Sequence, residues 1–322
     1  MPTSPSNDTA ARTATPDTAA APPAGDLEVA GVRITHPDRV VDPGRDLRKI
    51  DLVRYGESVA DLLLKHLKGR PVSLVRAPEG LDGESFFQKH AGRGAIPGLT
   101  LLDPALDAPH PPLIAVESVQ AVIGALQMGA IEFHPWGAKA NSLDRPDRLV
   151  LDLDPDPDLH WNHVIEAAEL VRQLLDQLGL RGFLKTSGGH GLHIVLPLRR
   201  CHSWDGVARF ARMAAETLAR RHPEVFVARA GAAQRVGRIF VDHGRNHRGA
   251  TTVAAWSPRA RLGLPVSVPL AWDELVTLPG PAPWTIATIG DLLAERREHD
   301  PWSLFETERQ ALGGASRLLV TR

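Results

Sequence analysis

Apolar side chains recur at helical spacing in three long stretches of this chain. Because one helical turn spans 3.6 residues, apolar positions three and four apart predict a helix that buries one face. Gly69 and Gly179 follow the first two stretches, where a glycine commonly ends a helix, and Ser203 precedes the third as a capping residue. A shorter helix is predicted near residues 289–297. The three long stretches are residues 51–67, 162–178 and 205–221.

Shorter apolar runs that lack this spacing predict strands. Strands and helices do not alternate in a regular βαβ rhythm, which favours an α+β fold with mixed or antiparallel sheets over a doubly wound parallel sheet. We expect a catalytic core of this class with flanking helices, preceded by an N-terminal α/β subdomain. The predicted strands cover residues 29–34, 71–76, 148–154, 182–185, 192–198, 238–242 and 251–256.

The composition changes after the first residues of the chain. Residues 1–25 consist mainly of Ala, Thr, Pro and Ser, so they cannot bury enough apolar surface to offset the entropy of ordering. We predict a disordered leader there. The rest is long enough to bury a substantial core. The expected organisation is an N-terminal part over 26–130, a catalytic core over 131–310 and a C-terminal tail over 311–322.

Charge and cysteine content exclude several classes of protein. Lys and Arg number 37 against 38 Asp and Glu, which excludes a polycation. The single cysteine, Cys201, excludes a disulfide framework, an iron–sulfur cluster and zinc modules that need two or more thiolates. Apolar runs are far shorter than the ~18 residues of a membrane span. We therefore expect a cytoplasmic protein without a membrane partner.

Two aspartates end the apolar run LVLDLDP at residues 149–155. Side chains alternate along a strand, so Asp152 and Asp154 share one face, where they repel each other unless a cation lies between them. This favours a Mg²⁺ or Mn²⁺ site over solvated strand-end carboxylates. An EF-hand loop fits poorly, because Pro157 stands where that loop needs Gly. A haloacid-dehalogenase phosphatase fits poorly, because Asp156 stands where that family usually has Thr or Val.

A third carboxylate, Asp242, ends another apolar run and precedes a basic turn. A third aspartate beside a paired Asp-x-Asp is what a two-metal phosphoryl-transfer site requires. Taken alone, Asp242 is equally consistent with an ordinary strand-end residue. Between Arg229 and Arg261, however, Lys and Arg outnumber Asp and Glu by six. This local excess of positive charge suits an anionic substrate.

A glycine-rich turn, KTSGGHGLH, occupies residues 185–193. Its glycines allow backbone N–H groups to turn toward an anion, and Lys185, Ser187, His190 and His193 add charge and hydrogen-bond donors. The turn lacks the Gly-Lys-Ser/Thr of a Walker A loop, and the pattern does not favour zinc. A polyphosphate-binding turn is our interpretation, and a plain hairpin turn is the alternative.

Together these motifs resemble the polymerase domain of bacterial DNA ligase D, a member of the archaeo-eukaryotic primase superfamily. Its three central motifs are similar to DLDP at 152–155, SGGHGLH at 187–193 and FVD at 240–242, the last followed by Arg245-Asn246. The resemblance extends from about residue 27 to 305. Its outer motifs are HPDR at 36–39 with Lys49, FFQKH at 86–90, EFHPWG at 132–137, TVA at 252–254 and SPRAR at 257–261.

The resemblance implies a primase-type core and a template-directed nucleotidyltransferase. Such an enzyme adds NTP or dNTP to a primer 3′-OH at DNA gaps and broken ends during non-homologous end joining. Two divalent metal ions, with Mn²⁺ preferred over Mg²⁺, would be held by Asp152, Asp154 and Asp242. The residues implied to contact the nucleotide are His134, near the sugar, and Ser187, His190, His193 and Arg245 at the triphosphate, with Arg259 and Arg261 as a basic patch.

Contacts to DNA follow from the same resemblance. Phe86 or Phe87 would stack on the templating strand, and His36, Arg39 and Lys49 would bind a 5′-phosphate. The implied partners are Ku and an ATP-dependent DNA ligase, at the nucleoid in the cytoplasm.

The sequence departs from this family pattern in places. His190 stands where many relatives carry Lys, and Leu262 stands where relatives often have Pro. We find no ligase or phosphoesterase motif in this chain. Two other functions stay open: a non-catalytic module that binds or bridges DNA ends, and a metal-dependent phosphatase or nuclease.

Overall fold

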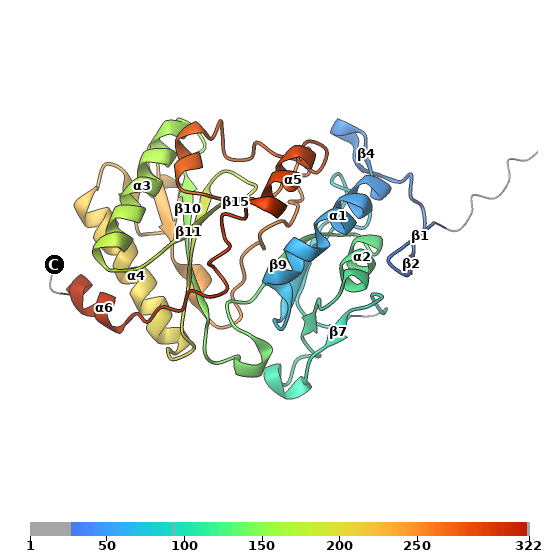
Figure 1. Ribbon diagram of the computed structural model, residues 1–322, viewed down its shortest axis with the longest axis horizontal. Coiled ribbons are helices and arrows are strands. Elements are labelled where there is room, and N and C mark those ends of the chain that lie inside the picture. The colour runs from blue at the N-terminus through green and yellow to red at the C-terminus, as the bar shows by residue number, and fades with distance from the viewer. Residues whose placement is uncertain (1–26, 93, 321–322) are drawn as a thin grey trace, which may run out of the picture.

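A six-stranded sheet forms the larger of two lobes (Figure 1). The structure, a computed structural model, describes residues 27–92 and 94–320. Neighbouring strands run antiparallel, except for the parallel pair β13 and β14. In spatial order the strands are β13 (Phe226–Val227), β14 (Ile239–Asp242), β10 (Arg148–Pro155), β12 (Leu192–Pro197), β11 (Phe183–Thr186) and β15 (Pro269–Leu270).

The two faces of this sheet have different surroundings because side chains alternate along β10. Leu149, Leu151 and Leu153 are buried in a core that includes residues of α3 (Trp161–Gln177) and α4 (Trp204–Arg221). Asp152 and Asp154 therefore lie on the opposite face. Figure 1 shows α3 and α4 at the same end of the molecule as α6. The last helix, α6 (Gly313–Val320), joins this core through Ala315 and Leu319, within the segment predicted as a tail.

The smaller lobe contains an antiparallel three-stranded sheet in the order β6-β5-β9. Helices α1 and α2 pack together over it, and Gly56 permits their close approach, since a Cβ there would lie 2.2 Å from Leu126 Cδ1. The bounds are β5 (Val72–Arg76), β6 (Phe86–Gln88), β9 (Ala130–Pro135), α1 (Lys49–Leu67) and α2 (Val119–Gln127).

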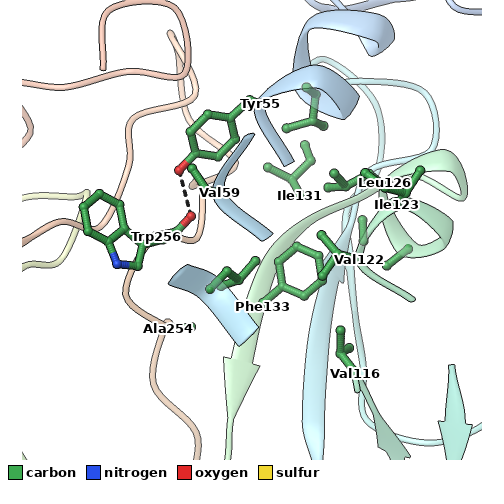
Figure 2. Close-up of a cluster of buried hydrophobic side chains, with 14 of the residues drawn as sticks. Tyr55, Val59, Val116, Val122, Ile123, Leu126, Ile131, Phe133, Ala254 and Trp256 are labelled. Carbon is green, nitrogen blue, oxygen red and sulfur yellow. Dashed lines mark hydrogen bonds between the residues drawn. The ribbon is translucent and has the colours of Figure 1, made fainter. Parts of the chain in front are cut away.

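Chain from both halves of the sequence builds the core of the smaller lobe. Tyr55 Oη of α1 donates a 2.8 Å hydrogen bond to the carbonyl of Trp256, and both residues belong to the same buried cluster as Val59 and Phe133 (Figure 2). Arg70 also forms a bidentate ion pair with Asp147, which directly precedes β10, at 2.6 and 2.8 Å. These long-range contacts fix the lobes against each other.

Small elements complete the fold. Three two-stranded hairpins lie in the N-terminal half, and α5 packs against the smaller lobe through Leu293. Their bounds are β1 (Glu28–Val29) with β2 (Val32–Arg33), β3 (Val40–Asp42) with β4 (Leu47–Arg48), β7 (Thr100–Leu101) with β8 (Ile114–Ala115), and α5 (Gly290–Glu298).

The predicted α+β class, with antiparallel sheets and flanking helices, is confirmed. The four predicted helices agree with α1, α3, α4 and α5 to within two residues at each end. Ser203 caps α4 by accepting a hydrogen bond from Gly206 N. The predicted leader lies outside the described residues. Within residues 27–92 and 94–320, none of the helices is both long and apolar enough to cross a bilayer.

Two predicted strands are wrong. Residues 29–34 form the turn and second strand of a hairpin, because Ala30 and Gly31 take positive φ angles of 50° and 74° and reverse the chain. Residues 251–256 form no strand beyond a single bridge from Thr251 to Trp136. Trp256, at the end of that segment, has a φ of +69°, outside the extended region that a strand requires.

Candidate active site

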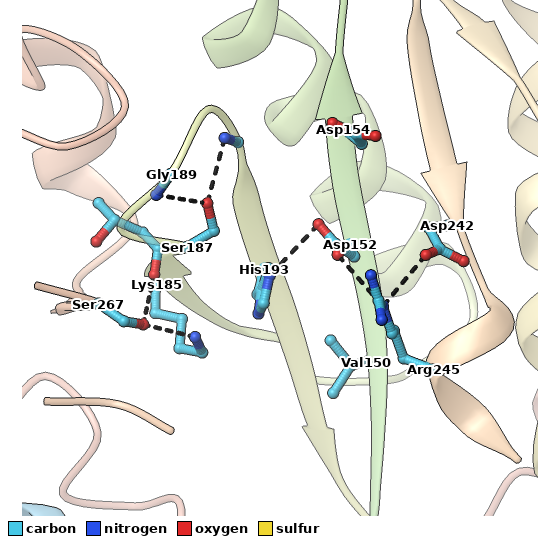
Figure 3. Close-up of polar contacts among 12 residues, drawn as sticks. Val150, Asp152, Asp154, Lys185, Ser187, Gly189, His193, Asp242, Arg245 and Ser267 are labelled. Atoms are coloured by element: carbon cyan, nitrogen blue, oxygen red, sulfur yellow. Dashed lines mark hydrogen bonds and ion pairs between the residues drawn. The ribbon is translucent and has the colours of Figure 1, made fainter. Parts of the chain in front are cut away.

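The register of the large sheet aligns four polar side chains in one row (Figure 3). Asp152 of β10 lies opposite Asp242 of β14 on one side and His193 of β12 on the other. Lys185 of β11 lies opposite His193. Residues opposed in this way project from the same face of a sheet. Two carboxylates, an imidazole and an ammonium group thus share the face that also carries Asp154.

A nitrogen-bearing side chain contacts each of the three carboxylates. His193 Nε2 lies 3.4 Å from Asp152 Oδ1. Arg245 bridges two strands, with Nε 3.8 Å from Asp152 Oδ2 and 3.2 Å from Asp242 Oδ2. Arg235 forms an ion pair with Asp154. Arg235 and Arg245 therefore offset part of the negative charge on this face.

Opposing effects set the protonation of the two aspartates on β10. Burial raises the pKa of Asp152, but the interactions with His193, Arg245 and Lys185 outweigh it and lower the pKa overall. Asp154 differs, because burial and the negative charges of Asp152 and Asp242 outweigh Arg235 and raise its pKa. Carboxylate oxygens that repel one another in this way are the donor set that Mg²⁺ and Mn²⁺ prefer. The three residues fit such ions.

The turn after β14 is fixed by side-chain hydrogen bonds. Asp242 Oδ1 accepts from Gly244 N at 2.7 Å. Asn246 extends the pairing with β10 beyond the end of β14, since its Oδ1 accepts from Val150 N and its Nδ2 donates to Val150 O, both at 2.8 Å. Arg245 sits between these anchors and is held close to the carboxylates.

Ser187 organises the glycine-rich turn. Its Oγ accepts hydrogen bonds from Gly189 N at 3.1 Å and Gly191 N at 3.3 Å, which leaves its hydroxyl hydrogen available to an anion. Gly191 is required by space, because a Cβ there would lie 1.9 Å from the carbonyl oxygen of Leu153. The turn is thereby pressed against β10, beside the carboxylates.

Lys185 does not face the cleft, contrary to the sequence interpretation. Its side chain is buried, and Nζ donates a 2.7 Å hydrogen bond to Ser267 Oγ. Burial lowers its pKa well below the usual value. The segment that carries Ser267 covers this end of the row, so Lys185 acts on Asp152 and His193 by its charge and not by contact with the cleft.

A buried carboxylate that the sequence did not single out lies behind the cleft. Glu132 Oε2 contacts His134 Nε2 at 2.6 Å and accepts from Arg259 Nε at 2.9 Å, while Oε1 accepts from Ala260 N at 2.8 Å. Burial opposes ionisation, but His134 and Arg259 outweigh it and lower the pKa of Glu132 to about 2. The sequence feature that could have indicated Glu132 is its spacing from His134. The two residues are two apart and therefore lie on one face of β9.

One cleft gathers most of the predicted site residues, and a neighbouring groove continues from it past Phe87 and Lys89. Phe87 lies edge-on to His134, with ring centroids 5.6 Å apart. Phe86 precedes it on β6 and projects to the opposite side, where Arg76 lies 5.2 Å from its ring centroid. The predicted residues in the cleft are His134, Asp152, Asp154, Ser187, His190, His193, Asp242, Arg245, Arg259 and Arg261.

The predicted phosphate-binding residues of the N-terminal stretch form a separate group. Arg39 N donates to His36 O at 3.1 Å, and Lys49 N donates to Arg39 O at 2.9 Å. Lys49 Nζ donates to Thr35 O at 2.6 Å, and burial with the charge of Arg39 lowers the pKa of Lys49 to about 8. Arg39 Nε is buried without a hydrogen-bond partner among the described residues. This group lies outside the cleft lined by the carboxylates.

Paired aspartates on β10, a third on the neighbouring β14 and the glycine-rich turn beside them are the arrangement expected of a primase-polymerase. The chain belongs to the family of LigD primase-polymerase domains, whose family model matches residues 48–302. The predicted family membership is therefore confirmed.

Two relatives illustrate this similarity. The multifunctional non-homologous end joining protein LigD of Pseudomonas aeruginosa is 53% identical over 293 residues, which cover 91% of this chain and 35% of that protein. The corresponding LigD of Mycolicibacterium smegmatis is 30% identical over 249 residues, 76% of this chain and 32% of that protein. The chain thus spans about a third of the length of these relatives.

A solved structure agrees with these matches. The polymerase domain of Mycobacterium tuberculosis ligase D, in complex with DNA, superimposes with a TM-score of 0.77 and 28% identity. The match covers 85% of this chain and 97% of that one. The likeness extends to the fold as a whole, and the roles of individual side chains stay predictions.

Proposed function

We propose that this chain is a template-directed nucleotidyltransferase that adds NTP or dNTP to a primer 3′-OH at DNA gaps and broken ends in non-homologous end joining. The observation that carries the proposal is the position of Asp152 between Asp242 and His193 on adjacent strands. Clustered carboxylates beside a DNA-binding surface would weaken a purely DNA-binding module, because they repel phosphate. The family membership supports the same function.

Asp152, Asp154 and Asp242 would hold two divalent ions, with Mn²⁺ preferred over Mg²⁺. When bound, such ions activate the primer hydroxyl and neutralise the charge that develops on the phosphates. The side chain of Arg245, half exposed, neutralises Asp152 and Asp242 and is free to turn toward a triphosphate. The pKa of His193 is lowered to about 4 by burial and by Lys185, so His193 is neutral near pH 7 and can support Asp152 by hydrogen bonding.

The remaining residues of the cleft suit a nucleotide and its template. Ser187, His190 and Arg261 would contact the triphosphate, and His134, held by Glu132, would lie near the sugar. Phe87 is exposed at the groove and would stack on the templating strand. Phe86 points away from this groove and is the weaker stacking candidate. Ku and an ATP-dependent DNA ligase are the proposed partners, at the nucleoid in the cytoplasm.

Extension of a labelled primer on a gapped duplex, with Mn²⁺ or Mg²⁺ and all four nucleotides, tests the proposal. We expect products longer than the primer in a divalent-cation-dependent reaction. Shortened products would instead support a nuclease, and an unchanged primer that is nevertheless bound would support a module for DNA ends. Either of these results would contradict the proposal.

We expect the 5′-phosphate preference of DNA binding to weaken at alkaline pH. Lys49 is protonated below its pKa of about 8 and loses its charge above it, whereas a terminal phosphate stays a dianion. The affinity ratio between gapped DNA with a 5′-phosphate and with a 5′-hydroxyl should therefore be constant near pH 7 and fall above pH ~8.

Fluorescence anisotropy at fixed ionic strength measures this ratio. Arg39→Gln should remove most of the preference, whereas Arg45→Gln, an exposed neighbour, should retain it. A ratio near one for the native chain at pH 7 would show that this group binds no terminal phosphate. That result would leave the polymerase assignment itself intact.

A further inference from the structure

A cluster of two histidines and an aspartate lies outside the carboxylate cleft. His90 Nε2 is 2.8 Å from Asp107 Oδ2, and His110 Nδ1 is 3.4 Å from the same oxygen. The two imidazole rings are stacked, with centroids 5.2 Å apart and planes inclined by 25°. One ligand atom from each residue lies within 4.8 Å of the others. Three potential metal ligands thus converge on one point.

We propose that His90, Asp107 and His110 form a site for a Zn²⁺-type transition-metal ion. Two imidazole nitrogens and one carboxylate oxygen are a typical ligand set for Zn²⁺, which binds them at about 2.0–2.2 Å. Mg²⁺ and Mn²⁺ prefer oxygen ligands, so this site and the three aspartates of the cleft select different cations. Water would occupy the fourth position on the exposed side of His110.

Backbone contacts pre-organise the three ligands. Asp107 is the last residue of a 3₁₀ helix, Pro104–Asp107, and its carbonyl accepts from His110 N at 3.0 Å. His90 forms a β-bridge with Leu113, and its carbonyl accepts from Gln88 Nε2 at 3.1 Å. The segments that carry the three ligands therefore lose little conformational entropy when an ion binds.

Asp107 is also oriented by a residue beyond the ligands. Arg248 Nη1 lies 3.6 Å from Asp107 Oδ1, and Arg248 Nη2 donates to Leu106 O at 2.8 Å. The second carboxylate oxygen is left directed at the imidazoles. Outer contacts of this kind typically change metal affinity 10–100-fold.

The position of the cluster suggests its role. His90 follows β6, which presents Phe87 to the groove beside the cleft, and Arg248 belongs to the chain that follows Asp242 and Arg245. An ion held here would tie the 3₁₀ helix Pro104–Asp107 to the end of β6. The proposed ion is therefore structural, and it stiffens the rim of this groove.

Calorimetric titration of the chain with Zn²⁺ tests the site. The buffer contains excess Mg²⁺, which occupies the three aspartates of the cleft. We expect one Zn²⁺ per chain and affinity at least about tenfold weaker in His110→Ala. Because the His110 side chain is 61% exposed, this change leaves the packing intact. His163→Ala is the matched control, since His163 is an exposed histidine 3.7 Å from the single carboxylate of Glu166. It should bind Zn²⁺ like the native chain, as should Asp242→Asn.

Two further measurements test whether the ion binds at His90, Asp107 and His110. Co²⁺ in place of Zn²⁺ should give the visible absorption of a four-coordinate nitrogen and oxygen site, and should lose it in His110→Ala. Zn²⁺ should also raise the thermal midpoint of the native chain but not that of His110→Ala. Absent Zn²⁺ uptake, equal uptake by His110→Ala and His163→Ala, or uptake that disappears in Asp242→Asn would each overturn the proposal. None of these readouts depends on polymerase activity.

Discussion

Asp152→Asn or Asp242→Asn should reduce nucleotide addition by at least about a thousandfold. Each substitution keeps the shape of the side chain but removes a negative charge from the row that we propose binds the divalent ions. Bound ions contribute several kcal/mol of transition-state stabilisation, and about 4 kcal/mol corresponds to three orders of magnitude in rate. Primer extension in single-turnover conditions measures this change.

Asp158→Asn provides the control for this prediction. Asp158 lies in the exposed loop four residues after Asp154, so it shares the local sequence but not the cleft. It should extend primers at the native rate. DNA binding without divalent ions should persist in all three variants, because the substitutions remove repulsion from phosphate. Extension by Asp152→Asn within tenfold of the native rate would refute the assignment of the carboxylates.

Glu132→Gln should lower both stability and nucleotide affinity. Glu132 is the shared acceptor for His134, Arg259 and Ala260 N, and its amide replacement cannot accept from all three. Removing the charge from such a buried group leaves its cationic partner unpaired, at a cost of about 3 kcal/mol in the free energy of unfolding. The nucleotide KM should rise because His134 and Arg259 line the cleft.

The pH dependence distinguishes this role from simple packing. The pKa of Glu132 is about 2, below its usual value of 4.5, so ionisation stabilises the fold above pH ~4.5 and the effect fades as pH falls toward 2. This difference corresponds to about 3 kcal/mol. The stability gap between the native chain and Glu132→Gln, measured by urea unfolding, should narrow from pH 7 to pH 3. An unchanged gap would show that the charge contributes nothing.

Local sequence patterns predicted the helices and strands whose own residues show a clear periodicity. The alternation around Asp152 and Asp154 placed both carboxylates on one face of a strand, as the structure shows. Helix α2 was missed because Val119–Gln127 is short and mostly apolar, and such a run cannot be told from a buried strand by its pattern, although Ser118 was available as a cap. Ser118 Oγ accepts from Ala121 N at 3.1 Å.

Contacts between distant segments could not be predicted in this way. The register that aligns Asp152 with Asp242 joins residues 90 positions apart, and it depends on packing of the whole sheet. The same limit applies to Lys185, which is covered by Ser267, and to Glu132, whose partner Arg259 lies 127 residues away. Sequence motifs named the candidate residues, but not which of them line the cleft.

Single-nucleotide incorporation opposite each of the four templating bases tests whether this chain is a template-directed polymerase. A gapped duplex with one unpaired templating base is supplied with all four nucleotides and a divalent ion, and the added nucleotide is identified by mass. We expect the added nucleotide to be complementary to the templating base in each case, and Asp152→Asn to add none. Addition that is independent of the templating base, or release of phosphate without any addition, would contradict this expectation.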